Sequence, residues 1–247
     1  MSASWIAADW PAPENIVAGT TLRTGGVSSG AFASLNLAAH VGDDPASVVE
    51  NRRRFRSGCE LPREPNWLRQ VHGTQAVRAN SGPAEPEADA IVTTDAGVVC
   101  AVLTVDCLPV VLASEDGSEV AAAHAGWRGL SAGILETTVS AFRARPARIL
   151  AWFGPAISKP AFEVGAEVRE QFVRESGSAA QYFSESDMGR WQADLYGLAT
   201  LRLDSCGVRR VFGCGCCTHA EPQRFFSFRR DGRCGRMATF VFRRNAG

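Results

Sequence analysis

The sequence predicts a single α/β domain over residues 1–247, with mixed β-sheets flanked by helices. Strand patterns and helix patterns mingle from end to end, without a linker, an internal repeat or a low-complexity tract. A chain of 247 residues can bury a sizeable core. Its hydrophobic content of 45% includes no run long enough to cross a membrane.

Two apolar runs in the middle of the chain organise the predicted fold. The first, Val98–Val105, is rich in β-branched residues and alanine, a composition typical of a strand buried on both faces. The second run, Val120–Ala123, is also predicted to be a strand. A turn signal at Glu115–Ser118 separates the two runs, which favours adjacent strands.

The remaining elements follow from periodicity and from helix-start signals. Strands are predicted for the other short apolar runs: Ile16–Thr24, Ala88–Thr93, Arg148–Phe153, Val208–Phe212, Arg224–Phe228 and Arg236–Phe242. Helices are predicted where apolar residues recur at helical spacing or a cap precedes them: Pro45 to about Ser57, Leu130–Arg143, Glu163–Glu175 and Trp191–Cys206. Asn51–Arg54 is expected to be a solvated face of the first helix, and residues 81–87 a loop.

The charge balance and the N-terminal segment exclude several classes of protein. Lys+Arg and Asp+Glu are equal at 26 each, so no global field favours nucleic acid or an anionic membrane. The N-terminal segment has neither a basic region nor an apolar one, so no signal peptide is predicted. Eight cysteines without a signal peptide are typical of cytoplasmic thiols. We therefore expect a cytoplasmic protein that binds neither nucleic acid nor membrane.

One cysteine and two histidines lie at the ends of apolar stretches. Cys107 follows the first central strand, His124 follows the second, and His72 closes another short apolar stretch. Zinc takes thiolate and imidazole ligands, and a catalytic zinc keeps three protein ligands and an open position. The same residues also suit a Cys–His nucleophilic pair, with Asp106 or Asp89 orienting the histidine. Spacing alone does not choose between a metal site and thiol catalysis.

A second group of thiols lies in the segment Cys214-Gly-Cys-Cys-Thr-His219. The adjacent residues Cys216 and Cys217 cannot easily chelate one tetrahedral ion together with Cys214. No second ligand pair follows at zinc-finger spacing. We expect reduced thiols in a passage from a strand to a loop.

Four polar side chains are candidate ligand contacts. Arg128, Arg229 and Arg230 lie beside glycines or aromatic residues at the ends of predicted elements. Guanidinium groups at such positions suit bidentate binding of phosphate or carboxylate, although each alone is also typical of a surface arginine. Asn36 is flanked by leucines, so its amide needs partners, either in a ligand or in the backbone of its own loop.

Nine short motifs together resemble the bacterial YfiH-type laccase-domain family. They stand in family order between about Trp10 and Phe242: Thr24–Ser28, Ser34–Leu37, Gly42–Pro45, Glu50–Arg52, Gln70–Gly73, Asp106–Pro109, His124–Gly129, Gly154–Ile157 and Phe226–Arg230. The family was once labelled polyphenol oxidase and is now associated with purine nucleoside phosphorylase activity. The sequence departs from the family pattern at Val105, where relatives commonly have alanine, and in the additional cysteines before Cys217.

The resemblance implies a metal site and an activity. It places the family's metal triad, with its catalytic role, on His72, Cys107 and His124, which favours zinc, with copper possible. It implies a cytoplasmic enzyme that phosphorolyses adenosine, inosine and 5′-methylthioadenosine, and that also deaminates adenosine. Whether the protein is a monomer or a homodimer stays open. A peptidoglycan-editing role is also attached to the family name.

Purine nucleosides and phosphate are therefore the expected substrates. An arginine would hold the phosphate, with Arg229 and Arg128 the first candidates and Arg230 the next. Asn36 is the candidate contact to base or ribose.

Two other activities stay open. A metal-free Cys–His hydrolase or deamidase would need only Cys107 and His124. Copper-dependent phenol oxidation has been attributed to relatives, but four histidines are too few for a multicopper centre. A non-enzymatic role in cell-wall metabolism ranks third.

Overall fold

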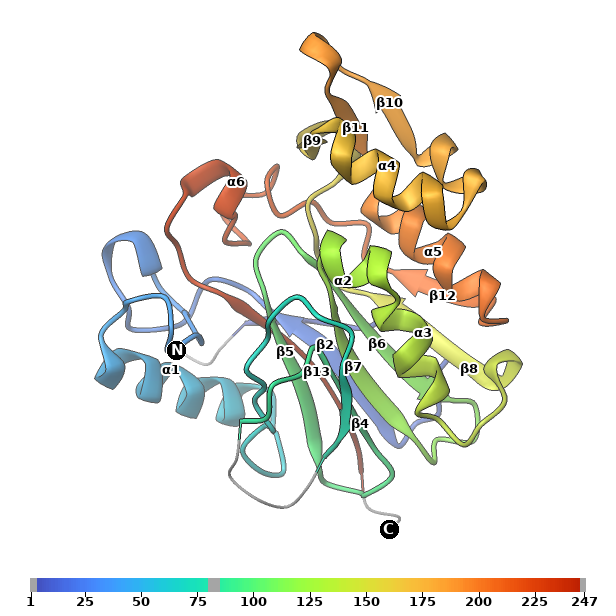
Figure 1. Cartoon of the computed structure of the whole chain (residues 1–247). Coiled ribbons are helices and arrows are strands. Elements are labelled where there is room, and N and C mark those ends of the chain that lie inside the picture. Colours follow the sequence, from blue (N-terminus) through green and yellow to red (C-terminus); the bar gives the residue numbers. More distant parts are fainter. Residues whose placement is uncertain (1–3, 80–84, 245–247) are drawn as a thin grey trace.

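Two β-sheets packed face to face form the centre of the structure, a computed structural model that describes residues 4–79 and 85–244 (Figure 1). The four-stranded sheet has the order β1-β2-β13-β5, formed by Trp5–Ala7, Ile16–Thr21, Met237–Arg243 and Val99–Thr104. The six-stranded sheet has the order β12-β8-β6-β7-β4-β3, formed by Arg210–Gly213, Ile149–Phe153, Leu108–Ser114, Val120–Ala125, Ala90–Thr93 and Ala76–Arg78.

Helices cover the outer face of each sheet. Helix α1 (Pro45–Gly58) packs on the four-stranded sheet through Phe55, which contacts Phe240. The six-stranded sheet is covered by three helices, α2 (Trp127–Ala132), α3 (Ile134–Ser140) and α5 (Leu195–Ser205), and α4 (Ala166–Glu175) packs against α2. The result is a four-layer arrangement, helix–sheet–sheet–helix (Figure 1).

Smaller elements complete the described chain. A three-stranded sheet, β10-β11-β9, projects beyond α4 and consists of Phe183–Glu185, Trp191–Ala193 and Glu163–Val164 (Figure 1). Helix α6 (Phe228–Asp231) is a single turn. Short 3₁₀ turns occupy Gly30–Phe32, Pro146–Arg148, Lys159–Ala161, Gly177–Tyr182 and Asp187–Gly189. No helix among the described residues is long and apolar enough to span a membrane.

The central strands are apolar on both faces because each sheet is covered on both sides. Every residue of β5, β6 and β7 is buried. Val102 and Val111 pack between the two sheets with Trp152, which is fully buried. The predicted mixed α/β fold is confirmed, and its extent as one domain over residues 1–247 stays a prediction.

The two central runs lie in different sheets, contrary to the expectation of adjacent strands. Strand β5 belongs to the four-stranded sheet, and β7 belongs to the six-stranded sheet. The turn at Glu115–Ser118 instead joins β7 to β6, because Leu108–Ser114 forms a strand of its own. The chain therefore crosses from one sheet to the other between Thr104 and Leu108, and Cys107 lies on this crossing.

Other predicted elements also differ from the structure. The helix expected over Leu130–Arg143 is divided into α2 and α3 at Gly133, whose φ of 106° breaks the helical path. The strand expected over Arg224–Phe228 is absent from the described structure, and the segment leads into α6, where Ser227 Oγ accepts a hydrogen bond from the Arg230 amide. The helices expected from Glu163 and Trp191 begin later, at Ala166 and Leu195, because the first residues pair as β9 and β11.

Two further expectations concern the first helix and the loop after residue 80. Asn51 is fully buried, so it does not belong to a solvated face. Its amide nitrogen donates to Ser28 Oγ at 2.8 Å and to the Asn36 carbonyl at 2.9 Å, which joins α1 to the preceding loop. Of the loop expected over residues 81–87, residues 81–84 lie outside the described part of the chain.

Candidate metal and substrate site

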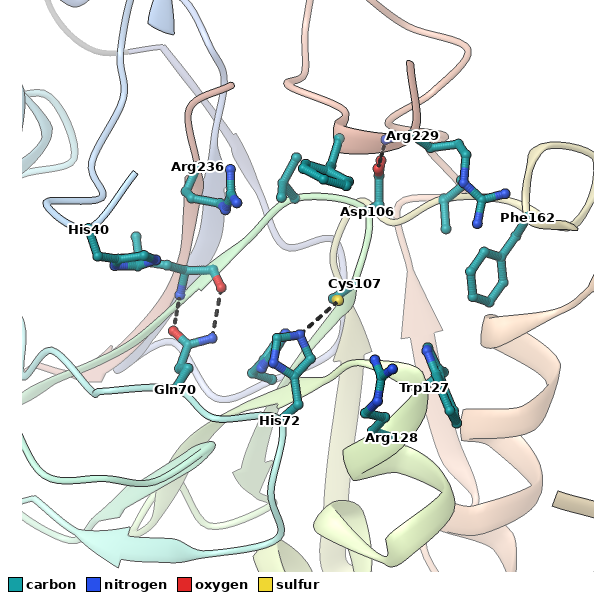
Figure 2. Close-up of a pocket in the computed structure, with 15 residues that line it drawn as sticks. His40, Gln70, His72, Asp106, Cys107, Trp127, Arg128, Phe162, Arg229 and Arg236 are labelled. Carbon is teal, nitrogen blue, oxygen red and sulfur yellow. Dashed lines mark hydrogen bonds between the residues drawn. The ribbon is translucent and has the colours of Figure 1, made fainter. Parts of the chain in front are cut away.

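His72, Cys107 and His124 come together where the chain crosses between the two sheets (Figure 2). One donor atom from each residue lies within 4.8 Å of the donors of the other two. Cys107 Sγ is 3.9 Å from His72 Nε2, and the two imidazole rings meet edge to face with centroids 4.7 Å apart. Within residues 4–79 and 85–244 this is the one group of three or more such side chains close enough to hold a metal ion.

A buried carboxylate, Asp89, positions both histidines. Its Oδ1 accepts a hydrogen bond from His124 Nδ1 at 2.8 Å and another from the His72 amide at 3.0 Å. Its Oδ2 accepts from the amides of Gly73 and Val71 at 2.7 and 3.2 Å. Holding Nδ1 leaves the opposite ring nitrogen of His124 free for a ligand. Asp89 therefore fixes one imidazole and also the loop that carries the other.

Asp106 does not orient a histidine. It has a φ of 66°, which is uncommon for a residue other than glycine. Its carboxylate accepts hydrogen bonds from Thr218 Oγ1 at 2.6 Å and from the Arg229 amide at 2.8 Å. These contacts hold the tight turn that presents Cys107 between the two sheets. Of the two orienting carboxylates considered from the sequence, Asp89 has that geometry.

A glycine is required beside the three donors. A Cβ at Gly126 would lie 3.0 Å from Cys107 Sγ, 3.0 Å from His72 Cδ2 and 3.4 Å from His124 Nε2. Any larger residue would therefore intrude into the group. The His124-Ala-Gly126 motif thus supplies one donor and the space next to it.

Cys107 and His124 influence each other's ionisation. Burial opposes charge on the Cys107 thiol, but the charge of His124 and hydrogen bonds from His124 and His72 outweigh it and lower its pKa to about 6. Burial also opposes charge on His124, yet Cys107 and Asp89 raise its pKa to about 9. Without a metal, the pair is therefore a thiolate beside an imidazolium near neutral pH.

The three donors open into a pocket of about 470 Å³. Arg128 and Arg229 line the pocket on the side of Trp127 and Phe162 (Figure 2). The Arg128 guanidinium lies over the Trp127 ring at 4.4 Å. The Arg229 guanidinium lies 5.5 Å from the Phe162 ring centroid and donates to the Glu163 carbonyl at 2.9 Å. Both arginines are exposed, so both can reach a ligand in the pocket.

Two residues expected to contact a ligand lie elsewhere. The Arg230 guanidinium donates to the carbonyls of Thr218, His219 and Phe225 and pairs with Asp231, outside the lining of the pocket. Asn36 is fully buried. Its amide bonds to Ala38 and Asp43, and its oxygen accepts from the Arg236 amide at 3.0 Å. Asn36 thus bonds within its own loop and to the backbone of Arg236, and its contact to base or ribose stays a prediction.

The amino-acid sequence matches one family model and several curated proteins over most of its length. The family model described as "Multi-copper polyphenol oxidoreductase laccase" matches residues 17–244. The chain belongs to this family. The purine nucleoside phosphorylase YfiH of Shigella flexneri is 49% identical over 238 residues, which cover 96% of this chain and 98% of that protein. The purine nucleoside phosphorylase PA4543 of Pseudomonas aeruginosa is 48% identical, with 97% of this chain and 98% of that protein covered.

Solved structures of YfiH-type relatives share the fold. Protein NMB0706 of Neisseria meningitidis superimposes with a TM-score of 0.95 at 45% identity, covering 98% of this chain and 100% of that one. YlmD from Geobacillus stearothermophilus gives a TM-score of 0.92 at 33% identity, covering 98% and 97%. The YfiH-type family inferred from the ordered motifs is therefore confirmed.

Within this laccase-type fold, three polar residues of the pocket were not identified as site residues from the sequence. His40 and Arg236 lie on the side opposite Arg128 (Figure 2). Gln70 exchanges two hydrogen bonds with the backbone of Leu103, at 2.7 and 2.8 Å, and so fastens the His72 loop to β5. Gln70 could have been found from its place in the Gln70–Gly73 motif. Nothing in the local pattern marked His40 or Arg236, because only the tertiary fold brings them to the pocket.

Proposed function

We propose that this protein is a zinc-dependent purine nucleoside phosphorylase that acts on adenosine, inosine and 5′-methylthioadenosine and also deaminates adenosine. One observation carries the proposal: His72, Cys107 and His124 are already gathered at a pocket lined by arginines. A pocket of about 470 Å³ is within the usual size for a small-molecule site. The names of the homologues support this class of enzyme.

The donor set fits zinc. Imidazole and thiolate are ligand types that zinc takes, and three protein ligands leave a position open. Asp89 supplies the outer-shell hydrogen bond that metal-bound histidines usually make. When bound, zinc would supply a Lewis acid at the open position. Copper also accepts these ligands, but the four histidines of the chain do not support multicopper phenol oxidation.

The arginines fit an anionic co-substrate. In phosphorolysis the bond from the purine nitrogen to ribose C1′ breaks, and a phosphate oxygen bonds to C1′. Guanidinium groups hold phosphate through paired, charge-assisted hydrogen bonds, and can keep the attacking oxygen near C1′. Arg128 and Arg229 are our candidates for this role, and Arg236 adds a cation on the opposite side. Trp127, Phe162 and Phe228 offer apolar surface for the purine.

An Arg229→Lys variant tests the phosphate role. Lysine keeps the charge but removes the planar fork, so the KM for phosphate should rise about tenfold, as expected for one charge-assisted hydrogen bond. Adenosine deamination, which uses no phosphate, should change less than about twofold. Ribose 1-phosphate and inosine are measured in parallel, with and without phosphate.

Arg230→Lys is the matched control, because the Arg230 guanidinium is bonded to backbone carbonyls outside the pocket. It should leave the KM for phosphate unchanged. Equal loss of both activities in Arg229→Lys would indicate a shared substrate contact or a folding defect. No loss in either activity would remove Arg229 from the phosphate site and transfer the role to Arg128 or Arg236.

Metal binding should release about one proton at pH 7.5. At that pH the metal-free site holds Cys107 as thiolate and His124 as imidazolium, since their pKa values are about 6 and about 9. Zinc needs the thiolate and a neutral imidazole, so only the His124 proton must leave. The affinity for zinc should therefore rise about tenfold per pH unit between pH values of about 6 and about 9. Below about 6 it should rise more steeply, because Cys107 must then also lose a proton when the metal binds.

Calorimetry in two buffers of different ionisation enthalpy counts the protons. Release of two protons at pH 7.5, with no thiolate absorbance in the ultraviolet spectrum of the metal-free protein, would show that Cys107 is a thiol before the metal binds. Release of none would show that His124 is already neutral. Either result contradicts the thiolate–imidazolium pair.

A further inference from the structure

The cysteine-rich segment after β12 is not part of the pocket. Cys214, Gly215 and Cys216 follow the last residue of that strand, and both thiols are half-buried. Gly215, between the two cysteines, is exposed and has a φ of 63°, a left-handed backbone conformation that favours glycine. Cys216 Sγ lies 3.5 Å from the Cys214 carbonyl oxygen, so the second thiol folds back toward the first residue.

The spacing permits a bond between these two sulfurs. Successive Cα atoms are about 3.8 Å apart, so residues two apart are separated by at most ~7.6 Å when extended and by less in a turn. Disulfides join Cα atoms up to about 6.8 Å apart. With a φ of 63°, Gly215 is not fully extended, so the two Cα atoms lie closer together than that limit. A Cβ built at Gly215 meets no neighbouring atom within 4 Å, so the backbone there has room to adjust.

The third thiol of the segment has other partners. Cys217 is buried, and its Sγ accepts hydrogen bonds from Ser158 Oγ at 2.9 Å and from the Ser158 amide at 3.4 Å. It is also adjacent to Cys216 in sequence, where a disulfide requires a strained backbone. Cys214 is therefore the natural partner of Cys216.

The surroundings of the two thiols give them different roles. The Arg224 guanidinium, which pairs with Glu221, also donates toward Cys216 Sγ at 3.6 Å, so a charged donor lies beside this sulfur. Burial raises the pKa of the Cys214 thiol to about 12, and the charge of Cys216 contributes to that rise. Because burial is the main cause of this rise, Cys214 is the weaker nucleophile of the two, and Cys216 is the thiol that reacts first.

We propose that Cys214 and Cys216 form a reversible disulfide and are a thiol-oxidation site of this protein. The oxidant is a low-molecular-weight disulfide such as oxidised glutathione. The Cys216 thiolate attacks one glutathione sulfur, which forms a mixed disulfide and releases one glutathione thiolate. Cys214 then loses its proton and attacks the Cys216 sulfur, which closes the protein disulfide and releases a second glutathione. Two protein thiols are oxidised and one glutathione disulfide is reduced.

Along the chain, the two cysteines lie close to a residue that contacts the turn beside the pocket. The segment continues to Thr218, whose hydroxyl donates to Asp106 at 2.6 Å, next to Cys107. Cys216, one end of the disulfide, is therefore two residues from Thr218, which directly contacts the turn that carries Cys107. The proposal does not depend on the activity proposed above.

Peptide mapping of the metal-loaded protein tests this site. The protein is incubated in mixtures of reduced and oxidised glutathione, quenched with iodoacetamide and digested. We expect residues 214 and 216 to lose both alkylatable thiols together, with a mass lower by two hydrogens and no glutathione adduct, and dithiothreitol should restore them. A synthetic Cys-Gly-Cys peptide in the same mixtures is the reference.

Three variants assign the steps. Cys214→Ser should stop at a stable glutathione adduct on Cys216, and Cys216→Ser should lose no thiol from the segment. Cys217→Ser should form the same disulfide as the natural sequence. A persistent adduct on Cys216 in the natural protein, a bond to Cys217, or unchanged thiols in mixtures that oxidise the reference peptide would each overturn the proposal.

Discussion

A Cys107→Ser variant should lose its bound zinc and more than about 100-fold of its phosphorylase turnover. Loss of an outer-shell partner alone typically costs 10- to 100-fold in metal affinity or activity, and Cys107 is a candidate direct ligand. A serine hydroxyl stays protonated near neutral pH, whereas the thiol of Cys107 has a pKa of about 6. The measurement is metal content after gel filtration, together with initial rates with inosine and phosphate.

Metal content separates zinc catalysis from thiol catalysis, because Cys107→Ser would abolish activity in both cases. Cys206→Ser is the control, since Cys206 is a half-buried thiol outside the pocket lining and should keep both metal and turnover. If metal-free natural protein keeps full turnover and loses it on alkylation of Cys107, the Cys–His alternative replaces the zinc site.

The elements of the fold were predictable where burial alone determines them. The runs that form β5 and β7 are almost entirely apolar, because one face of each strand packs against the other sheet and helices cover the opposite face. Their sheet membership was not predictable, since it depends on distant pairings. Strand β13, close to the end of the chain, inserts between β2 and β5, with Thr239 opposite both Thr20 and Val102.

The candidate site was predictable in part for a similar reason. His72, Cys107 and His124 stand at the ends of apolar stretches, and the structure brings them together. Their role as metal ligands stays a prediction. The choice of Asp89 over Asp106 required the pairing of β4 with β7, which places Ala90 opposite Ala123 and so brings Asp89 beside His124.

The arginines show the limit of local pattern most clearly. Arg229 and Arg230 are adjacent on the single turn of α6, yet one lines the pocket and the other bonds to backbone carbonyls. One residue of displacement on a short helix turns a side chain by about 100°, and that direction depends on what the turn packs against. Arg236 was missed because it precedes a strand and its place beside the pocket arises only from the fold.

An Asp89→Asn variant should bind zinc about 10- to 100-fold more weakly and unfold more easily by about 2 to 4 kcal/mol. Each carboxylate oxygen of Asp89 accepts two hydrogen bonds, from His72 and His124 on one side and from Val71 and Gly73 on the other. Asparagine replaces one of these oxygens with an NH₂ group, which is itself a donor. Two of the four protein donors would then lose their acceptor and lie against this NH₂ group in a fully buried position.

Asp43→Asn is a matched control for that variant, because it separates loss of stability from loss of the metal site. Asp43 accepts hydrogen bonds from Ser28 Oγ, Asn36 Nδ2 and the Asp44 amide, and it does not line the pocket. It should lower the free energy of unfolding and leave zinc affinity unchanged, whereas Asp89→Asn should lower both. Chemical denaturation of the metal-free proteins gives the first quantity, and competition with a chelator gives the second. Unchanged zinc affinity in Asp89→Asn would show that the His124 imidazole and the His72 loop hold their positions without the carboxylate.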